Sequence, residues 1–327
     1  MTFKNNWEKT DQQFKLPPET IQAMVERALP GKELASHEVI SGGCANLNIK
    51  FHLLNEPQPL ILRVYIRDKE AAYREQKLAE LIKHSVPLPE VYFVGDCEDY
   101  RYAITEYMPG ITLRDLLLNH PNDSVQSIML QAGQILADIQ QFQFPTAGFF
   151  DADLKVSQPI TKQDYLTFVQ TCLAHPTVVE QIGLNNIDNI KKYHEKYSAL
   201  LLDETKSHLV HADYDPANIL VDKVEGQWKI TAILDWEFSH SGPTLLDVAI
   251  MLRYAHHMPP IFEEAFLQGL KQGGVTLPEN WRISIQLLNL SALLDCLVRC
   301  TPQESPNRCA DIRELIDHIL PNLEKAS

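Results

Sequence analysis

The sequence contains no long uninterrupted apolar run that would suit a membrane span. Its longest apolar region, SIQLLNLSALLDCLV at residues 284–298, is interrupted by Gln286, Asn289, Ser291 and Asp295. That pattern predicts an amphipathic helix of a folded core. The N-terminal stretch MTFKNNWEKTDQQF is polar throughout and lacks the apolar segment of a secretory signal. We therefore expect a cytoplasmic protein with no membrane partner.

Basic residues are also scarce, since 29 Lys and Arg face 43 Asp and Glu for a formal net charge of −14. Nucleic acids and anionic membranes are bound through basic patches, so this balance argues against both as partners. An acidic surface suits a cationic ligand, although it also simply keeps a protein soluble. None of the six cysteines forms a C-x-x-C pair or has metal-ligand spacing with histidines, which predicts reduced and mostly packed thiols. They are Cys44, Cys97, Cys172, Cys296, Cys300 and Cys309.

The first hundred residues predict a small antiparallel sheet with one long helix. Strand-like runs occur near residues 37–43, 46–54 and 60–66, and residues 91–108 read as a hairpin that turns at 96–99. Residues 68–84 carry apolar side chains at helical spacing. A shorter helix is expected near residues 18–29.

The remainder of the chain is mostly helical in its pattern, with one exception. Residues 124–142 place apolar side chains on one helical face. The exception is the stretch 208–238, in which NILVD and WKITAILDW predict a hairpin that turns at Glu225-Gly226, inside a helical region. A sheet part followed by a helical part is an α+β arrangement, and no linker of low complexity separates the two.

The segment HADYDPAN at residues 211–218 follows a strand-like apolar run, SHLV at 207–210, and leads directly into that hairpin. It is rich in turn-forming residues, so an ordinary surface loop is one interpretation. The other is a metal and hydroxyl site, because the hairpin returns its second strand, ending at Asp235, beside Asn218 and Asp213. Two carboxylates and an amide then converge, and such hard oxygen ligands suit Mg²⁺ bound to phosphates.

These residues carry a resemblance to a known family. HADYDPAN resembles the catalytic loop of kinase-fold phosphotransferases, and ILDWEFSHSGPTLLDVA at residues 233–249 resembles the metal-binding segment of the aminoglycoside phosphotransferase and choline kinase-like family. The resemblance implies that Asp213 is the catalytic base and that Asn218 and Asp235 hold magnesium. It also implies that Asp247 braces the loop, as a structural residue. We expect His211 to buttress the loop as well, because a His before a catalytic Asp is more often a satisfied core donor than a proton carrier.

The resemblance implies the two-lobed protein kinase-like fold. We expect an N-terminal nucleotide-binding lobe at residues 1–105, a hinge at 106–112 and a catalytic, acceptor-binding lobe at 113–327. Backbone groups of the hinge, at Glu106 to Met108, are expected to meet the adenine edge of ATP.

Three further positions are expected to contact the phosphates of ATP. Ser41, Gly42 and Gly43 lie between two strands, where backbone N–H groups can approach phosphates, although a Gly-Gly hairpin turn is by itself more often structural.

The third strand carries Arg63 where the wider kinase pattern has Lys. Glu75 lies on the inward apolar face of the following helix and needs a partner. Arg63 can grip both this carboxylate and phosphate oxygens, although a purely structural ion pair remains the alternative.

The substrate class follows from what is missing. No A-P-E motif follows Asp235, so the peptide-docking segment of protein kinases is absent from the pattern, and a small-molecule hydroxyl acceptor is expected. Aminoglycoside-, choline- and homoserine-like acceptors all occur in the family, and the acidic balance favours an amine-bearing one. His256-His257 is not expected to bind metal, because no third ligand is spaced beside the pair. The rival interpretation is a nucleotide-binding regulatory pseudokinase without turnover, favoured only by Arg63.

Overall fold

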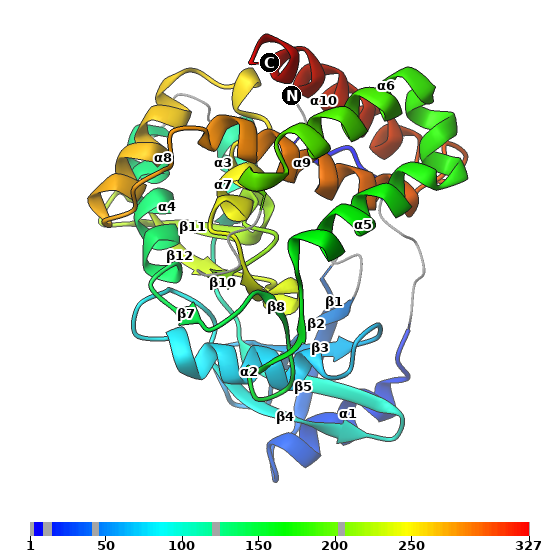
Figure 1. Ribbon diagram of the computed structural model, residues 1–327. Coiled ribbons are helices and arrows are strands. Elements are labelled where there is room, and N and C mark those ends of the chain that lie inside the picture. The colour runs from blue at the N-terminus through cyan, green and yellow to red at the C-terminus, as the bar shows by residue number, and fades with distance from the viewer. Residues whose placement is uncertain (1–2, 9–14, 41–45, 120–124, 202–206, 327) are drawn as a thin grey trace.

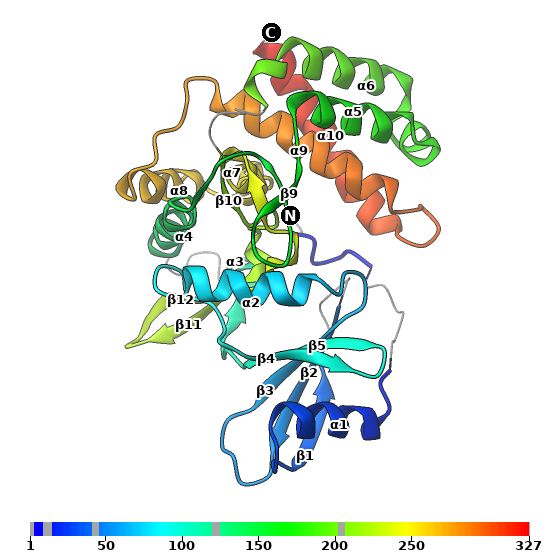
Figure 2. The same ribbon diagram turned by 60° about the horizontal axis from the view of Figure 1, so that its bottom comes forward.

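The computed structural model describes residues 3–8, 15–40, 46–119, 125–201 and 207–326. Its N-terminal part is an antiparallel sheet with the strand order β1-β2-β3-β5-β4, as Figures 1 and 2 show. The strands are β1 (Leu34–Val39), β2 (Asn46–Leu53), β3 (Leu60–Tyr65), β4 (Val91–Cys97) and β5 (Tyr100–Glu106). Helix α1 (Pro18–Ala28) packs on one face of this sheet, and α2 (Ala71–Ile82) on the other.

Strand alternation decides which side chains of β3 face the helical part. Leu62 and Val64 are fully buried in the cluster that includes α1. Because successive side chains of a strand point to opposite faces, Arg63 and Tyr65 lie on the α2 face. Tyr65 packs there against Ala71 and Ala72.

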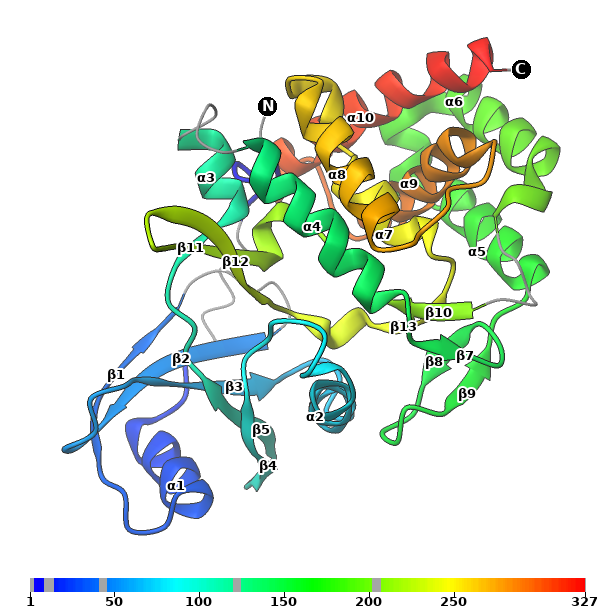
Figure 3. The same cartoon turned by 90° about the vertical axis from the view of Figure 1, so that its left-hand side faces the viewer.

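The helical part lies beyond α2, with its helices stacked away from the sheet (Figure 3). Its α-helices are α3 (Leu113–Asn119), α4 (Val125–Ile139), α5 (Lys162–Ala174), α6 (Pro176–Lys196), α7 (Leu245–Met251), α8 (Ile261–Gln272), α9 (Trp281–Val298) and α10 (Pro306–Lys325). Single-turn 3-10 helices are η1 (Ser198–Leu200), η2 (Pro216–Asn218), η3 (Trp236–Phe238) and η4 (Ala255–His257).

Helices α4 and α8 cross at two glycines. A Cβ atom added to Gly133 would lie 2.1 Å from the carbonyl oxygen of Phe266, and one added to Gly269 would lie 2.1 Å from that of Leu130. Neither position has room for a side chain, so the two backbones are in direct contact.

The predicted hairpin is present within the helical part. It consists of β11 (Ile219–Val224) and β12 (Gln227–Ile233), and β6 (Ile111–Thr112) pairs with its outer edge. Glu225 and Gly226 both have positive φ angles, 52° and 78°, as a two-residue turn of this kind requires. The second strand ends two residues earlier than expected, because Asp235 has a φ of 66°, which an extended strand cannot continue.

A second small sheet was missed by the sequence analysis. Its strands are β7 (Gln143–Phe144), β8 (Gly148–Phe150), β9 (Val156–Pro159), β10 (Ser207–Val210) and β13 (His240–Gly242), in the order β7-β10-β13-β8-β9. Only β10 was expected as a strand. The others have two to four residues, too few for alternation to be visible.

Helix α9 contains the longest apolar region of the sequence, residues 284–298. By length and composition this helix could cross a membrane, but 56% of its 18-residue apolar stretch is buried inside the fold. It packs against α5, α6, α7 and α10. This burial is the pattern of a core helix.

The N-terminal residues 3–8 do not lie with the sheet. Phe3 belongs to the core of the helical part, and Trp7 packs against that core. The sequence-based division had placed these residues in the first lobe.

Candidate active site

Residues 211–218 form a loop between β10 and β11, and a buried carboxylate holds its start. Asp247, in the first turn of α7, accepts the backbone N–H groups of His211 and Ala212, each at 2.8 Å. Burial raises the pKa of Asp247 to about 7, whereas the two N–H donors favour its charged form. Ala212 has a φ of 65°, so the loop turns sharply just before Asp213.

His211 joins this loop to the hairpin. Its Nε2 lies 2.9 Å from the carbonyl oxygen of Leu234, and the backbone N–H of Asp213 donates to its Nδ1 at 3.2 Å. That pair of bonds fits the neutral ring with its proton on Nε2. Complete burial lowers the pKa of His211 and favours the same state. His211 therefore has a structural role: its two ring nitrogens link the catalytic loop to the end of the hairpin.

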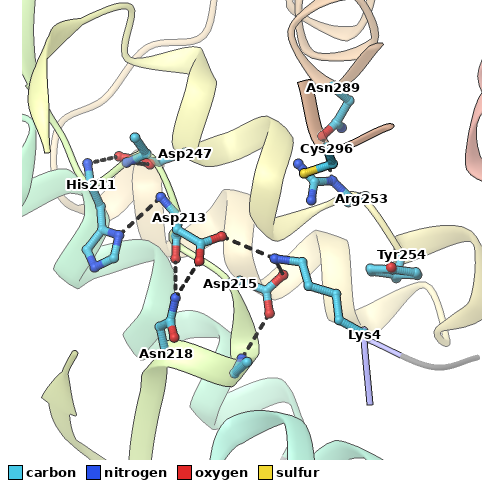
Figure 4. A network of polar contacts seen from close by, with 12 residues as sticks. Lys4, His211, Asp213, Asp215, Asn218, Asp247, Arg253, Tyr254, Asn289 and Cys296 are labelled. Atoms are coloured by element: carbon cyan, nitrogen blue, oxygen red, sulfur yellow. Dashed lines mark hydrogen bonds and ion pairs between the residues drawn. The ribbon is translucent and has the colours of Figure 1, made fainter. Parts of the chain in front are cut away.

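Asp213 is held at both carboxylate oxygens (Figure 4). The Asn218 side chain donates to its Oδ2 at 2.8 Å and to its backbone oxygen at 3.0 Å. The Lys4 ammonium contacts its Oδ1 at 3.1 Å. Burial by itself would raise the pKa of Asp213, but the charge of Lys4 and its contact with the carboxylate bring the pKa below its usual value. The group is therefore a carboxylate, as a proton acceptor must be.

Asp235 follows the hairpin, and its side chain turns towards the sheet. The N–H of Leu234 donates to the backbone oxygen of Asn218 at 2.8 Å, so the hairpin does bring the two segments together. The carboxylate of Asp235 nevertheless contacts Arg63 at 2.5 Å. The sequence predicted that Asp235 would approach Asp213 and Asn218. The backbones do approach, but the side chain of Asp235 forms its ion pair with Arg63 of β3.

Arg63 also lies beside Glu75 of α2, the partner expected from the sequence, at 3.4 Å. Glu75 accepts a second hydrogen bond from the hydroxyl of Tyr65 at 2.9 Å. Burial raises the pKa of Glu75, and the charge of Arg63 opposes that rise. Arg63 thus bridges one carboxylate from the sheet side and one from the hairpin side.

Two functional candidates, Glu237 and Lys4, were missed by the sequence analysis. Glu237 accepts a hydrogen bond from Asn46 of β2 at 2.8 Å, and burial together with the charge of Asp235 raises its pKa to about 7. Its place two residues after Asp235 was the available signal. Lys4 had no such signal, because 209 positions separate it from Asp213.

The hard oxygen donors at this place fit a magnesium ion. Asn218 and Asp235 are the residues that would hold it, with Glu237 beside them, and Mg²⁺ prefers such ligands. In the structure the Asp235 carboxylate pairs with the Arg63 guanidinium.

The remaining residues that the sequence analysis assigned to the nucleotide site are Glu106 and Met108, which the structure describes, and Ser41, Gly42 and Gly43, which it does not. Glu106 ends β5, and its carboxylate accepts the N–H of Glu90 at 3.2 Å. Met108 follows in a stretch without regular structure, and its role stays a prediction. Ser41, Gly42 and Gly43 lie outside the described residues.

Comparison with known proteins agrees with this arrangement. The pattern of the phosphotransferase enzyme family matches residues 36–282. The chain belongs to this family. Among curated relatives, hygromycin-B 4-O-kinase of Escherichia coli is 26% identical over 177 residues, which cover 50% of this chain and 47% of that protein. The alignment therefore spans about half the length of that relative.

Solved members of the same family share the fold, including its two-lobed kinase-like arrangement. An aminoglycoside phosphotransferase in ternary complex with ADP and hygromycin B superposes with a TM-score of 0.68 at 18% identity, covering 92% of this chain and 98% of that one. Macrolide 2'-phosphotransferase of Brachybacterium faecium gives 0.62 at 16% identity, covering 91% and 98%.

Proposed function

We propose that this phosphotransferase family member transfers the γ-phosphate of ATP to a hydroxyl group of a small molecule. The observation that carries the proposal is the ionised Asp213, fixed by Asn218 and Lys4 in a loop that Asp247 braces. In this proposal Asp213 accepts the proton of the acceptor hydroxyl. A carboxylate so oriented needs little reorganisation during the reaction.

Charge neutralisation falls to the other side of the site. Asn218 and Asp235 would hold magnesium, which when bound offsets charge on the β and γ phosphate oxygens. Arg63 would bind phosphate oxygens, and Glu75 keeps its guanidinium oriented. The turn at Ser41 to Gly43 and the stretch from Glu106 to Met108 complete the proposed nucleotide site.

The acceptor class is proposed from the relatives and from a cavity. The relatives named above act on hygromycin B and on macrolides, according to their names, and an aminoglycoside-like or macrolide-like alcohol is the first class to test. A cavity of about 250 Å³ opens beside Ala212 of the catalytic loop. Helix α5 lines it with Tyr165 and Phe168, and α9 with Leu288 and Ala292. Its largely apolar wall suits the carbon skeleton of an acceptor.

Asp213→Asn tests the proposal. The substitution keeps the shape of the side chain, but the new amide has one acceptor oxygen for the two donors that now flank it, and it cannot take the hydroxyl proton. Phosphate transfer should fall by roughly 10²–10⁴, the usual scale for a positioned general base. Affinity for Mg-ATP should stay within a few fold, because Asp213 would face the acceptor.

The assay is ATP consumption with hygromycin B, other aminoglycosides and macrolides as acceptors, with calorimetry for Mg-ATP binding. Wild-type turnover by Asp213→Asn would remove Asp213 from the mechanism. A wild-type protein that binds Mg-ATP and phosphorylates nothing in the panel would instead favour a binding role.

A further inference from the structure

The N-terminal segment Phe3–Glu8 is seated in the helical part next to the catalytic loop. Phe3 is fully buried, and its ring lies 5.3 Å from that of Tyr254 and 6.3 Å from that of Phe262, measured between centroids. A completely buried aromatic ring is a strong anchor, because its release would expose its whole apolar surface to water. One end of the segment is therefore fixed by packing.

The other end of the segment is fixed by hydrogen bonds to α10. The Trp7 indole N–H donates to Asp311 at 2.7 Å. The Glu8 carboxylate accepts the backbone N–H groups of Asn307 and Arg308, at 2.7 and 3.1 Å. A carboxylate at the first turn of a helix is stabilised by both the free N–H groups and the helix dipole.

Lys4 lies between these two anchors and points into the catalytic loop (Figure 4). Its ammonium contacts Asp213 at 3.1 Å and Asp215 at 2.9 Å, and its side chain is 16% exposed. Asp215 is fully buried and uses its other oxygen to accept the N–H of Ala217 at 3.0 Å. Two carboxylates two residues apart repel one another, and a buried one needs a partner. One ammonium serves both.

We propose that Lys4 is a positioning residue of the active site, which reaches the catalytic loop from the N-terminus and orients the carboxylate of Asp213 for the acceptor hydroxyl. This inference rests on the proposed function. Lys4 holds Oδ1 of Asp213 while Asn218 holds Oδ2, so the two contacts together define the plane of the carboxylate. With Lys4 removed, Asn218 alone would locate it, and the nearby charge of Asp215 would push it away.

The same contact could also be read as a removable strap that blocks the acceptor site. The burial of Phe3 and the bonds of Trp7 and Glu8 argue against that reading, because all of them would have to be broken for the strap to leave. The two readings predict opposite results. Removing the Lys4 charge lowers turnover if Lys4 positions Asp213 and raises it if the segment blocks the site.

The test uses the full chain with Lys4→Met, which keeps length and removes charge, and Lys4→Arg, which restores a cation. Lys32→Met is the matched control, since Lys32 pairs with Glu56 on the exposed surface far from the loop. Lys4→Met should lower kcat by about 10²-fold, the scale of a misplaced reacting group. KM for ATP should stay within about twofold, Lys4→Arg should recover most of kcat, and Lys32→Met should match wild type.

A second experiment, in the Asp215→Asn variant, distinguishes positioning of Asp213 from a purely structural role in which Lys4 only neutralises Asp215. Asp215→Asn removes the buried charge that needs a partner and keeps the oxygen that accepts the Ala217 N–H. Adding Lys4→Met to Asp215→Asn should lower the melting temperature less than Lys4→Met does in the wild-type background, and should still lower kcat. If kcat recovers fully in this double variant, Lys4 only neutralises Asp215 and the proposal is wrong.

A readout without turnover separates this inference from the proposed function. Hydrogen exchange of the peptide at residues 207–223, followed by mass spectrometry on the protein without ligands, should be faster in Lys4→Met and normal in Lys4→Arg and Lys32→Met. If the wild type phosphorylates nothing but this pattern appears, the proposed function fails while the ordering by Lys4 stands. Unchanged exchange in Lys4→Met, or a rise in its turnover, overturns the inference.

Discussion

Replacing Arg63 by Ala should destabilise the protein far more than replacing its partner Glu75 by Gln. Arg63 is 13% exposed at its side chain and pairs with two carboxylates, Glu75 at 15% exposure and Asp235 at 27%. Removing one member of a buried ion pair typically costs 3–5 kcal/mol, because the other charge is left alone. Both carboxylates here keep some contact with water, and burial already favours protonated Glu75, so we expect about 2–3 kcal/mol.

Glu75→Gln leaves a smaller deficit. Arg63 retains Asp235, and the amide oxygen of Gln can still accept the hydroxyl of Tyr65. The expected loss is about 1 kcal/mol, the net value of an ordinary hydrogen bond. The order of the two variants therefore depends on Arg63 serving two carboxylates at once.

Urea unfolding followed by far-ultraviolet circular dichroism is the assay. The four tryptophans, Trp7, Trp228, Trp236 and Trp281, all lie outside the β1–β5 sheet, so their fluorescence reports on the hairpin and helical part. Because Arg63 lies in the sheet, the urea midpoint of Arg63→Ala should fall more when followed by circular dichroism than when followed by tryptophan fluorescence. Equal stabilities of Arg63→Ala and Glu75→Gln would refute the bridging role, and unchanged Mg-ATP affinity in Arg63→Ala would remove it from the nucleotide site.

Two further predictions concern the cavity and the histidines. Ala292→Phe should fill the cavity beside Ala212, raising KM for the acceptor at least tenfold with ATP affinity unchanged, as steady-state kinetics will show; an unaltered acceptor KM would place the acceptor elsewhere. Burial and the neighbouring rings of His318 and His257 lower the pKa of His256 to about 4. Between about pH 4 and 6.5 the unfolded chain therefore binds more protons than the folded one, and stability declines as the pH falls through that window. His256→Gln should flatten this decline in melting temperature, by a modest amount because the site is exposed, and an identical slope would contradict the assignment.

The sequence was sufficient where chemistry is local along the chain. His211, Asp213 and Asn218 lie within eight residues, and helical spacing placed Glu75 on the inward face of α2, where the family pattern implied Arg63 as its partner. The family resemblance added the bracing role of Asp247, whose two hydrogen bonds are present. These features depend on spacing, which a sequence displays directly.

The sequence was insufficient where distant segments meet. Strand pairing predicted the approach of Asp235 to Asn218, but which way its side chain points depends on a left-handed backbone angle that no pattern displays. The charge partner of Asp213 comes from Lys4, in a polar stretch with no periodicity of its own. A short strand such as β8 exists because β9 and β13 lie on either side of it.

The glycine crossing of α4 and α8 has a mechanical consequence. Because the backbones touch at Gly133 and Gly269, α4 and α8 cannot slide past each other without a steric clash, and the pair forms one rigid unit, the α4–α8 beam. Tyr214, in the catalytic loop, is tied to this beam through its hydroxyl, which donates to the carbonyl of Ala132 at 2.9 Å. The catalytic loop is therefore fixed to the rigid α4–α8 beam as well as to α7, through the bonds of Asp247.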